Sequence, residues 1–415
     1  MWKTWWPSCF FCINEGLGGE EVNITNSSIR VFILSFQLLL AKITFMSLLL
    51  GHPPKLCVRK PVLVRASPLL SNGISSSSVQ TPPCNIIGAK QCEENVGKLI
   101  IANANERKWT YLDKKVPLDL VYNHPYNEMV TIGSSHGWVA TLRYDGILRL
   151  QDDLNPVASD SDPKRISLPP LVTLPYCQTQ IITNVSMSAP SPEEEDCVVA
   201  VKFLGPQLSF CRPAAQCNPE WINIRIANPC FFSSRVMFSK KDDMFCILGS
   251  GGDIIGSWDL RKHKHTPKLQ KLQFQNLPEL KNTTREVLSS CCCTSEHLVE
   301  SRCTGETFLV KQYKKTAEIV FGIAKMKTEA VMVFKLDEEG NAVYTQDIGD
   351  LSIFLSKSEP FCVPSSSFPG MDRNKVYIFD VNEVGIFNLS KDRYFGGIFT
   401  PAFGAPYYIP PQKID

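Results

Sequence analysis

Residues 137–150 read GWVATLRYDGILRL, and this short stretch decides the class of fold. Two runs of strand-forming residues, 137–144 and 147–150, are separated by Asp145-Gly146. An Asp-Gly pair between two such runs is a strong signal of a β-hairpin, because the tight turn needs backbone angles that Gly and Asp adopt readily. The stretch therefore predicts two antiparallel strands joined by a short turn.

The same pattern recurs along the chain. Turn residues separate four further pairs of strand-like runs: 197–203 with 207–212, 244–248 with 254–259, 331–336 with 342–346, and 375–379 with 383–389. Another hairpin is expected around residues 306–313. Proline-bearing connectors such as residues 167–170 lie between the hairpins, and no long amphipathic helix interrupts the series.

Repeated hairpins of similar size predict an all-β fold, a β-propeller-like ring of five or six antiparallel blades. In such a ring each blade buries its apolar face against its neighbours, and the repetition leaves only short, protected edges. The alternative is a pair of β-sandwiches. Residues 93–415 are expected to form this β-domain, which a disordered N-terminal leader precedes.

The composition fits a globular domain without a basic surface. The chain of 415 residues is 44% hydrophobic and 20% charged. Eight Lys/Arg and three Asp/Glu lie before residue 93, which leaves 35 basic and 38 acidic residues in the expected β-domain. A mildly acidic domain has no overall positive charge to attract nucleic acid or anionic lipid. We therefore expect no nucleic-acid partner.

Residues 46–92 have the composition of an organelle transit peptide. They contain no Asp or Glu, five basic residues and the serine run 75–78. A membrane potential that is negative inside draws in a cationic, acid-free leader. Arg65-Ala66-Ser67 suits mitochondrial processing, and Val64-Arg65-Ala66 would also suit a chloroplast. We expect a leader that directs the chain to the mitochondrion. The chloroplast is the alternative address, and a Ser/Pro-rich linker is the structural alternative.

Residues 1–45 do not fit this leader. Residues 31–50 are nearly all apolar and would be a membrane-anchor candidate, with Asn23 and Asn26 as glycosylation acceptors. A transit peptide downstream of a membrane anchor would have no use. We therefore interpret residues 1–45 as an over-extended or non-native N-terminus, with translation starting at Met46. No stable membrane insertion of the mature form is expected.

Sixteen cysteines are scattered without regular spacing, unlike a secreted disulfide framework. The strongest similarity to a metal site is Cys291-Cys292-Cys293, with His297 and Cys303 nearby. Zinc ligands are usually spaced C-x2-C, whereas adjacent cysteines on a strand point to alternate faces. We expect reduced, buried thiols rather than a metal centre.

Other candidate motifs have structural interpretations. Ser135 and His136 are neighbours on an expected strand and would point to opposite faces, so they do not form a catalytic dyad. Residues 249–252 lack the Lys-Ser/Thr and the helix of a phosphate loop and predict a hairpin turn. The acidic pair 152–153 lacks the glycine and terminal glutamate of a calcium loop. The basic run 261–265 predicts a solvated loop. We assign no catalytic, cofactor-binding or metal-ligating residue and expect no cofactor.

The C-terminal third carries the most distinctive motifs. They are residues 349–355 (GDLSIFL), 361–363 (FCV), 368–370 (FPG), 375–380 (KVYIFD) and 385–389 (GIFNL). This block resembles the signature of the plant "domain of unknown function 295" family, many members of which carry an N-terminal F-box. Residues 132–138 resemble the family's early strand-turn block, and the resemblance covers most of residues 109–409. The motifs also have a physical role. Residues 349–350 would turn the chain into a buried strand, and Phe368 would fill the core at a turn.

The resemblance implies no active site. An acid-free leader occupies the place of the F-box, which resembles an organelle-directed subgroup that has lost it. The Leu277-Pro278 pair is similar to an F-box start but lies mid-domain and predicts a turn. We therefore expect a non-enzymatic, monomeric interaction module with an unknown protein partner. The alternatives are an F-box-type ubiquitin-ligase adaptor and an enzyme, and an enzyme would need polar residues with perturbed pKa values at the axis.

Overall fold

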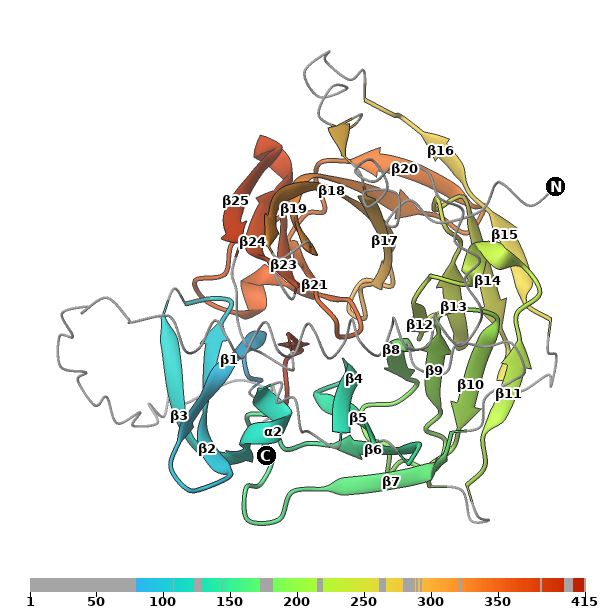
Figure 1. Ribbon diagram of the computed structural model, residues 1–415. Coiled ribbons are helices and arrows are strands. Elements are labelled where there is room, and N and C mark those ends of the chain that lie inside the picture. The colour runs from blue at the N-terminus through green and yellow to red at the C-terminus, as the bar shows by residue number, and fades with distance from the viewer. Residues whose placement is uncertain are drawn as a thin grey trace, which may run out of the picture.

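Six sheets follow one another around a central axis in the computed structural model of the chain (Figure 1). The structure describes residues 80–413 except 107, 123–128, 144, 172–181, 215–218, 261–265, 279–287, 289, 292, 321–322, 381–382 and 399–405. Within these residues each sheet has four or five strands, and two strand pairs are parallel. The ring of six blades confirms the predicted β-propeller and excludes the pair of sandwiches.

Each of the first three blades contains four strands. Blade one consists of β26 (Tyr408–Ile409), β1 (Cys84–Gln91), β2 (Val96–Asn103) and β3 (Trp109–Pro117). The short helix α2 (Leu118–Val121) follows it. Blade two consists of β4 (Met129–Ser135), β5 (Trp138–Arg143), β6 (Ile147–Gln151) and β7 (Arg165–Pro170). Blade three consists of β8 (Ile182–Met187), β9 (Val199–Phe203), β10 (Gln207–Cys211) and β11 (Ile222–Arg225).

Blades five and six are larger than the other four. Blade four consists of β12 (Val236–Ser239), β13 (Met244–Leu248), β14 (Ile254–Trp258) and β15 (Lys268–Lys271). Blade five consists of β17 (Cys293–Glu300), β18 (Thr307–Val320), β19 (Ile323–Leu336), β20 (Asn341–Thr345) and β16 (Gln273–Gln275). Blade six consists of β22 (Phe361–Pro364), β21 (Leu351–Leu355), β23 (Lys375–Asp380), β24 (Glu383–Asn388) and β25 (Arg393–Ile398). Short 3-10 turns occupy Pro229–Phe231, Ser365–Ser367 and Leu389–Lys391.

Five of the predicted hairpins are present, whereas the hairpin expected around residues 306–313 is not, because residues 307–313 lie within the single long strand β18. In residues 137–150, β5 pairs antiparallel with β6 and Leu142 lies opposite Leu148. Gly146 has a φ of 83°, and its N–H donates to the Arg143 carbonyl at 3.0 Å. The Asp145 carboxylate accepts a hydrogen bond from the Ile147 N–H at 3.1 Å, so both turn residues have the predicted role. The pairs β9–β10, β13–β14, β19–β20 and β23–β24 match the other four predicted hairpins.

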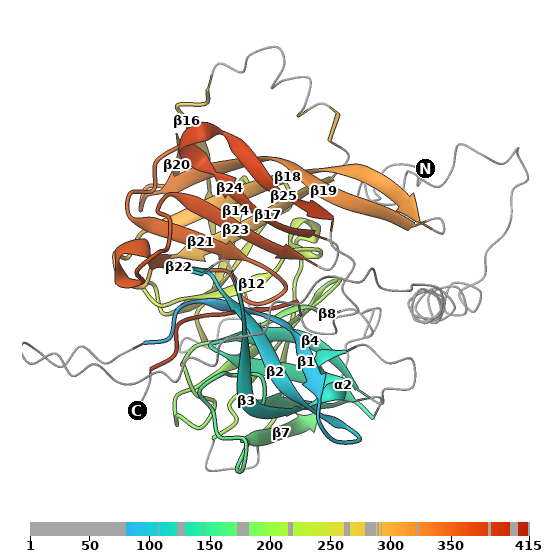
Figure 2. The same cartoon turned by 90° about the vertical axis from the view of Figure 1, so that its left-hand side faces the viewer.

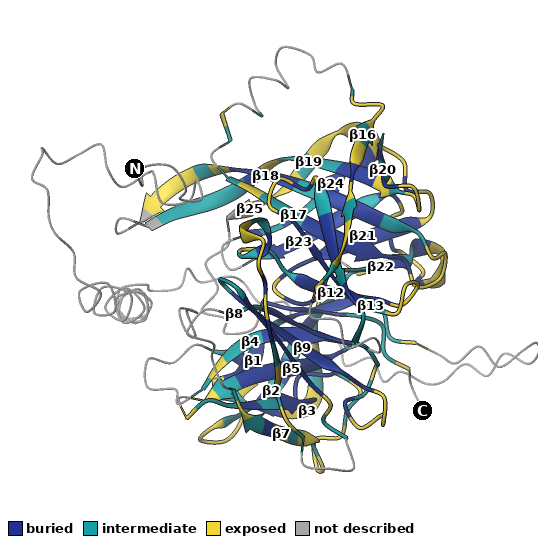
Figure 3. Cartoon of the chain, turned by 90° about the vertical axis from the view of Figure 1, so that its right-hand side faces the viewer, coloured by how far each residue is buried: buried dark blue, intermediate teal, exposed yellow. Residues whose placement is uncertain are grey.

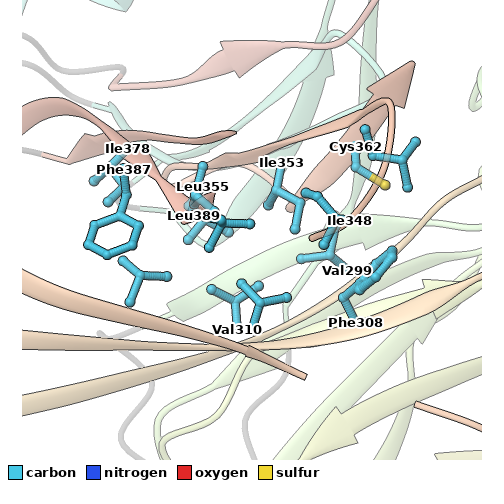
Figure 4. Close-up of a cluster of buried hydrophobic side chains, with 14 residues drawn as sticks. Val299, Phe308, Val310, Ile348, Ile353, Leu355, Cys362, Ile378, Phe387 and Leu389 are labelled. Atoms are coloured by element: carbon cyan, nitrogen blue, oxygen red, sulfur yellow. The ribbon is translucent and has the colours of Figure 1, made fainter. Parts of the chain in front are cut away.

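The hydrophobic core is divided into six clusters, and each cluster lies between two neighbouring blades. Between blades five and six, Val299, Phe308 and Val310 pack against residues that include Ile353 and Phe387 (Figure 4). Buried positions run along the strands, while exposed ones gather at turns and outer edges (Figure 3). Every blade thus depends on its neighbours for burial, as expected for a propeller.

Blade one is completed by the end of the described chain. Cys84 lies opposite Ile409 and Asn85 opposite Tyr408, and Gln80 bridges to Lys413. The predicted boundary at residue 93 is therefore wrong, because residues 84–91 form β1 inside the ring. The absence of acids suggests a leader, but residues 84–89 of this strand are buried or half-buried inside the ring. The other predicted segments, 1–45 and most of 46–92, lie outside the described residues.

A long hairpin in blade five extends beyond its sheet (Figure 2). Strands β18 and β19 have 14 residues each, whereas the flanking β17 and β20 have 8 and 5. Their pairing continues to Val320 opposite Ile323, and the Ile319 side chain near the tip is 69% exposed. We call residues 315–320 and 323–327 the projecting hairpin. No helix in the described part of the chain is long and apolar enough to cross a membrane.

Candidate functional site

A short segment between β21 and β22 crosses the axis of the ring. We call residues 356–360 the axial plug. The Ser356 carbonyl accepts a hydrogen bond from Arg235 Nη1 at 2.5 Å, and Ser356 Oγ accepts one from the Tyr408 N–H at 3.1 Å. The Glu359 N–H donates to the Ser134 carbonyl at 2.7 Å. These partners come from blades four, one and two, so the axial plug links blade six to blades across the ring.

Glu359 is the central residue of the axial plug. Its carboxylate accepts hydrogen bonds from Ser135 Oγ (2.5 Å) in β4, Ser186 Oγ (2.8 Å) in β8 and the Phe238 N–H (3.1 Å) in β12. Burial raises the pKa of Glu359, and these hydrogen bonds oppose that shift. One carboxylate therefore holds the innermost strands of three blades in register.

Glu300 has a similar role between blades four and five. It ends β17 and accepts hydrogen bonds from Ser239 Oγ at 2.6 Å and from the N–H groups of Lys240 (2.9 Å) and Lys241 (3.2 Å). The Glu300 side chain is buried. Both central carboxylates thus have their oxygens occupied by inter-blade hydrogen bonds, which buried charges require.

A cavity of about 350 Å³ opens on one side of the axial plug. Its lining includes Ser134, His136, Arg302, Glu300 and Glu359. Arg302 Nη1 and Nη2 lie 3.0 and 2.7 Å from the two ring nitrogens of His136. A neutral imidazole has one acceptor nitrogen, so one of these contacts is a hydrogen bond. Burial, followed by the Arg302 charge, lowers the pKa of His136 to about 3, and the ring is neutral at pH 7.

Two cysteines, Cys303 and Cys362, line this cavity. Ser301 Oγ is 3.1 Å from Cys303 Sγ, and Cys303 is exposed. Burial raises the pKa of the neighbouring Cys362 thiol to about 12, so it is protonated and unreactive at neutral pH. Ser134 Oγ is buried at the cavity and has no hydrogen-bond partner among the described residues.

The structure separates the residues of the supposed metal cluster. Cys293 begins β17, His297 is buried in the middle of that strand, and Cys303 lies in the loop beyond its other end. Cys292 lies outside the described residues. Among the residues that the structure describes, no group of three or more His, Cys, Asp or Glu side chains could hold a metal ion.

Other motifs also have structural positions. Ser135 donates to Glu359 rather than to its neighbour, and His136 begins the turn after β4 with a φ of 54°, so the expectation that both lie on one strand is wrong. Gly251 and Gly252 form the β13–β14 turn, as predicted. Asp153 is buried and forms an ion pair with Arg165 at 2.7 Å. The basic run 261–265 lies outside the described residues.

The sequence analysis did not identify Glu359, Glu300 or Arg302. A weak signal exists for Glu300, because a carboxylate directly follows the apolar residues Leu298 and Val299 of one strand. An acid at the end of a buried strand must find donors, and in a propeller those donors lie on the next blade. Neither Glu359 nor Arg302 has such a local signal, because their partners are distant in the sequence.

Three solved structures show a distant similarity to this chain. The coronin WD40 domain of Toxoplasma gondii is 12% identical with a TM-score of 0.27, and the match covers 62% of this chain and 64% of that domain. Raptor of Chaetomium thermophilum is 11% identical with a TM-score of 0.25, and the match covers 77% of this chain and 29% of Raptor. BBS1N, solved in complex with ARL6DN, is 12% identical with a TM-score of 0.25 over 65% of this chain and 83% of that chain. No curated protein matches the sequence.

A protein-family match is more informative. Residues 101–388 match the KIB1-4 beta-propeller family, and this range includes strands of all six blades. The match covers more than half of the chain, and the matched range includes the axial plug and both central carboxylates. The chain belongs to the KIB1-4 beta-propeller family.

Proposed function

We propose that this chain is a non-enzymatic protein-interaction module that binds a protein partner through the projecting hairpin. The observation that carries the proposal is an apolar side chain near the end of a projecting pair of strands. Ile319 is 69% exposed there, and β18 and β19 remain paired up to the tip. Binding residues frequently lie on connecting segments that a rigid scaffold positions at the surface.

The base of the projecting hairpin is fixed to blade six. Glu383 of β24 is buried and accepts hydrogen bonds from the Thr328 N–H (2.6 Å) and Thr328 Oγ1 (2.8 Å). Gln312 Nε2 also donates to Thr328 Oγ1, at 2.6 Å. Lys325 and Glu318 form an ion pair at 2.8 Å across the two strands. A two-stranded element is marginal by itself, so these contacts support a defined orientation for a partner.

The axis supports a binding role better than catalysis. Glu359 and Glu300 have their carboxylate oxygens engaged by hydrogen bonds that join blades, and Ser135 donates to Glu359. A general base must be free to accept a proton from a substrate. The enzyme alternative draws support from polar residues at the axis, such as His136 and Glu359, whose pKa values are perturbed.

The experiment places a photo-crosslinking amino acid at residue 319 and, as a control, at residue 222. Ile222 in β11 is 53% exposed and lies on another blade. We expect a discrete protein adduct from position 319 in cells of the source organism. We expect excess unlabelled wild-type chain to compete this adduct away, and a chain whose residues 316–325 are replaced by a two-residue turn not to compete. Identical adducts from both positions, or none from position 319, would contradict the proposal.

We also propose the finer identity: a mitochondrial member of the "domain of unknown function 295" group without an F-box, with the chloroplast as the alternative address. The support is the acid-free composition of residues 46–79. Fluorescent fusions that begin at Met46 and at Met1 test the address. Organellar signal from the Met46 fusion is expected. Cytosolic signal, together with capture of the ligase subunit that binds F-boxes, would favour the adaptor alternative.

A further inference from the structure

Basic residues converge on the side of the axial plug opposite the cavity. Arg235 directly precedes β12, whereas the Phe238 and Ser239 groups that bind the central carboxylates lie at the other end of that strand. Lys357 belongs to the axial plug itself. We call Arg235, His297, Lys314, Lys357 and Asp380 the axial basic cluster. Its members come from blades four, five and six.

Electrostatic contacts connect the members of the axial basic cluster. Besides burial, which lowers the pKa of Lys357, the Asp380 charge raises that pKa and the Arg235 charge lowers it. For His297, burial and the charges of Arg235 and Lys314 lower the pKa, and the Asp380 charge raises it. Lys314 Nζ lies 2.8 Å from Asp380 Oδ2. Within the described chain, Asp380 is the one carboxylate whose charge acts on Arg235, Lys357 and His297. Three cations and one carboxylate leave a net charge of about +2, with the imidazole neutral.

His297 is the second and independent indication of a site. It is 7% exposed, and neither ring nitrogen has a hydrogen-bond partner of acceptable geometry among the described residues. The Gln312 side chain raises the pKa of the His297 ring slightly against the effect of burial, but its amide nitrogen donates to Thr328 Oγ1. Buried polar groups are nearly always satisfied, so an unpartnered imidazole beside three cations indicates a missing acceptor.

Solvent can reach the axial basic cluster. Lys357 is exposed and Arg235 is half-buried. Burial nevertheless lowers the pKa of both groups. Lys357 and Arg235 therefore contact both water and surrounding protein atoms. Arg235 uses one nitrogen for the Ser356 carbonyl, and its guanidinium has further donors.

We propose that the axial basic cluster binds a small phosphate-bearing anion. A phosphate group carries a charge of about −1.5 to −2 at pH 7, which matches the cluster better than a single carboxylate. The Arg235 guanidinium and the Lys357 ammonium would donate to its oxygens, and the His297 N–H would supply a neutral donor. The anion would thereby contact blades four, five and six at the axis.

The test uses the full chain and inorganic phosphate in isothermal titration calorimetry. We expect saturable binding that Lys357→Gln weakens by about tenfold or more, as is typical for loss of a charged hydrogen-bond donor. The matched control is Lys391→Gln, at an exposed lysine in the turn after β24, which should bind as the wild type does. Circular dichroism establishes that both variants are folded.

A second measurement separates specific binding from a general salt effect. Phosphate should raise the melting temperature of the wild type more than sodium chloride at equal ionic strength, and Lys357→Gln should remove the difference. Acetate in place of phosphate tests the preference for a dianion and should bind more weakly. Absence of saturable phosphate binding, equal affinity of Lys357→Gln and Lys391→Gln, or equal effects of phosphate and chloride would each overturn the proposal.

Discussion

At the scale of single residues, the axis is organised by buried carboxylates that join blades. Glu359 alone satisfies two hydroxyl groups and one backbone N–H from three different inner strands. Each buried donor that loses its acceptor costs about 1–3 kcal/mol. The stability of the ring should therefore be sensitive to this residue, although it lies far from every one of its partners in sequence.

We predict that Glu359→Ala lowers the free energy of unfolding by at least about 3 kcal/mol, because three donors lose their acceptor together. Glu359→Gln retains one acceptor oxygen and should be destabilised less. Denaturant unfolding of both variants measures the difference. Glu318→Ala, at an exposed position of the projecting hairpin, is the control and should change the value by less than about 0.5 kcal/mol. Equal loss in the Ala and Gln variants would contradict the role of the carboxylate oxygens.

His297 makes stability depend on pH in a defined direction. Burial, then the Arg235 and Lys314 charges, lowers its pKa from 6.5 to about 3. Between these values the unfolded chain binds a proton that the folded chain does not, so stability falls as the pH is lowered through that window. One such group contributes a slope of up to about 1.4 kcal/mol per pH unit.

We therefore predict that His297→Gln reduces the loss of stability between pH 7 and pH 4, whatever its effect at pH 7. Urea unfolding of the wild type and the variant across that range measures both slopes. Parallel curves for the two proteins would show that His297 does not titrate as described.

At the scale of elements, strand β21 illustrates what the sequence predicted and what it did not. The turn at Gly349-Asp350, the buried strand behind it and the core position of Phe368 were all predicted and are present. These features are local, because a turn residue and an apolar run each determine their own conformation. The parallel pairing of β21 with β23 was not predicted, since the chain between them contains β22 and adds an extra strand to the blade.

Phe354 in β21 is the residue of this element on which packing most depends. Its ring stacks between the rings of Phe361 and Tyr377, with centroid distances of 4.9 and 4.7 Å. It also meets the ring of Tyr408 in blade one edge-on, with a centroid distance of 5.1 Å. We predict that Phe354→Ala lowers the free energy of unfolding by roughly 3–5 kcal/mol, the usual cost of emptying a buried phenylalanine site. Phe395→Ala in β25, where the ring is 48% exposed, should cost less than about 1 kcal/mol. Chemical denaturation that ranks the two variants equally would refute this.

At the scale of the whole molecule, the repeated hairpins could be predicted from the sequence, whereas the contacts at the axis could not. The hairpins imposed a ring because no single blade can bury its own apolar faces. The central residues Glu359, Arg302 and Arg235 obtain their partners only when blades separated by a hundred or more residues meet. No local pattern specifies such contacts. The acid-free composition also led to the wrong assignment of β1 to the leader, because absence of acids is compatible with a buried strand as well as with a transit peptide.

The closure of blade one by β26 leads to a prediction about the intact ring. Removal of residues 406–415 deletes Tyr407, Tyr408 and Ile409, which are all buried between blades. We predict a loss of roughly 5 kcal/mol or more in the free energy of unfolding, since each buried side chain contributes about 2–5 kcal/mol. Removal of residues 414–415 alone is the control. Thermal unfolding that is unchanged by the longer truncation would show that the ring closes without β26.

The same closure determines the order of events during biosynthesis. β1 leaves the ribosome before every other described strand, yet the neighbour that completes its sheet, β26, is translated after all of them. A nascent chain can assemble blades two to six while it is being made, but its first sheet keeps an open edge until β26 has been made. During that interval the unpaired edge of β1 is a site where chaperones or other nascent chains can bind.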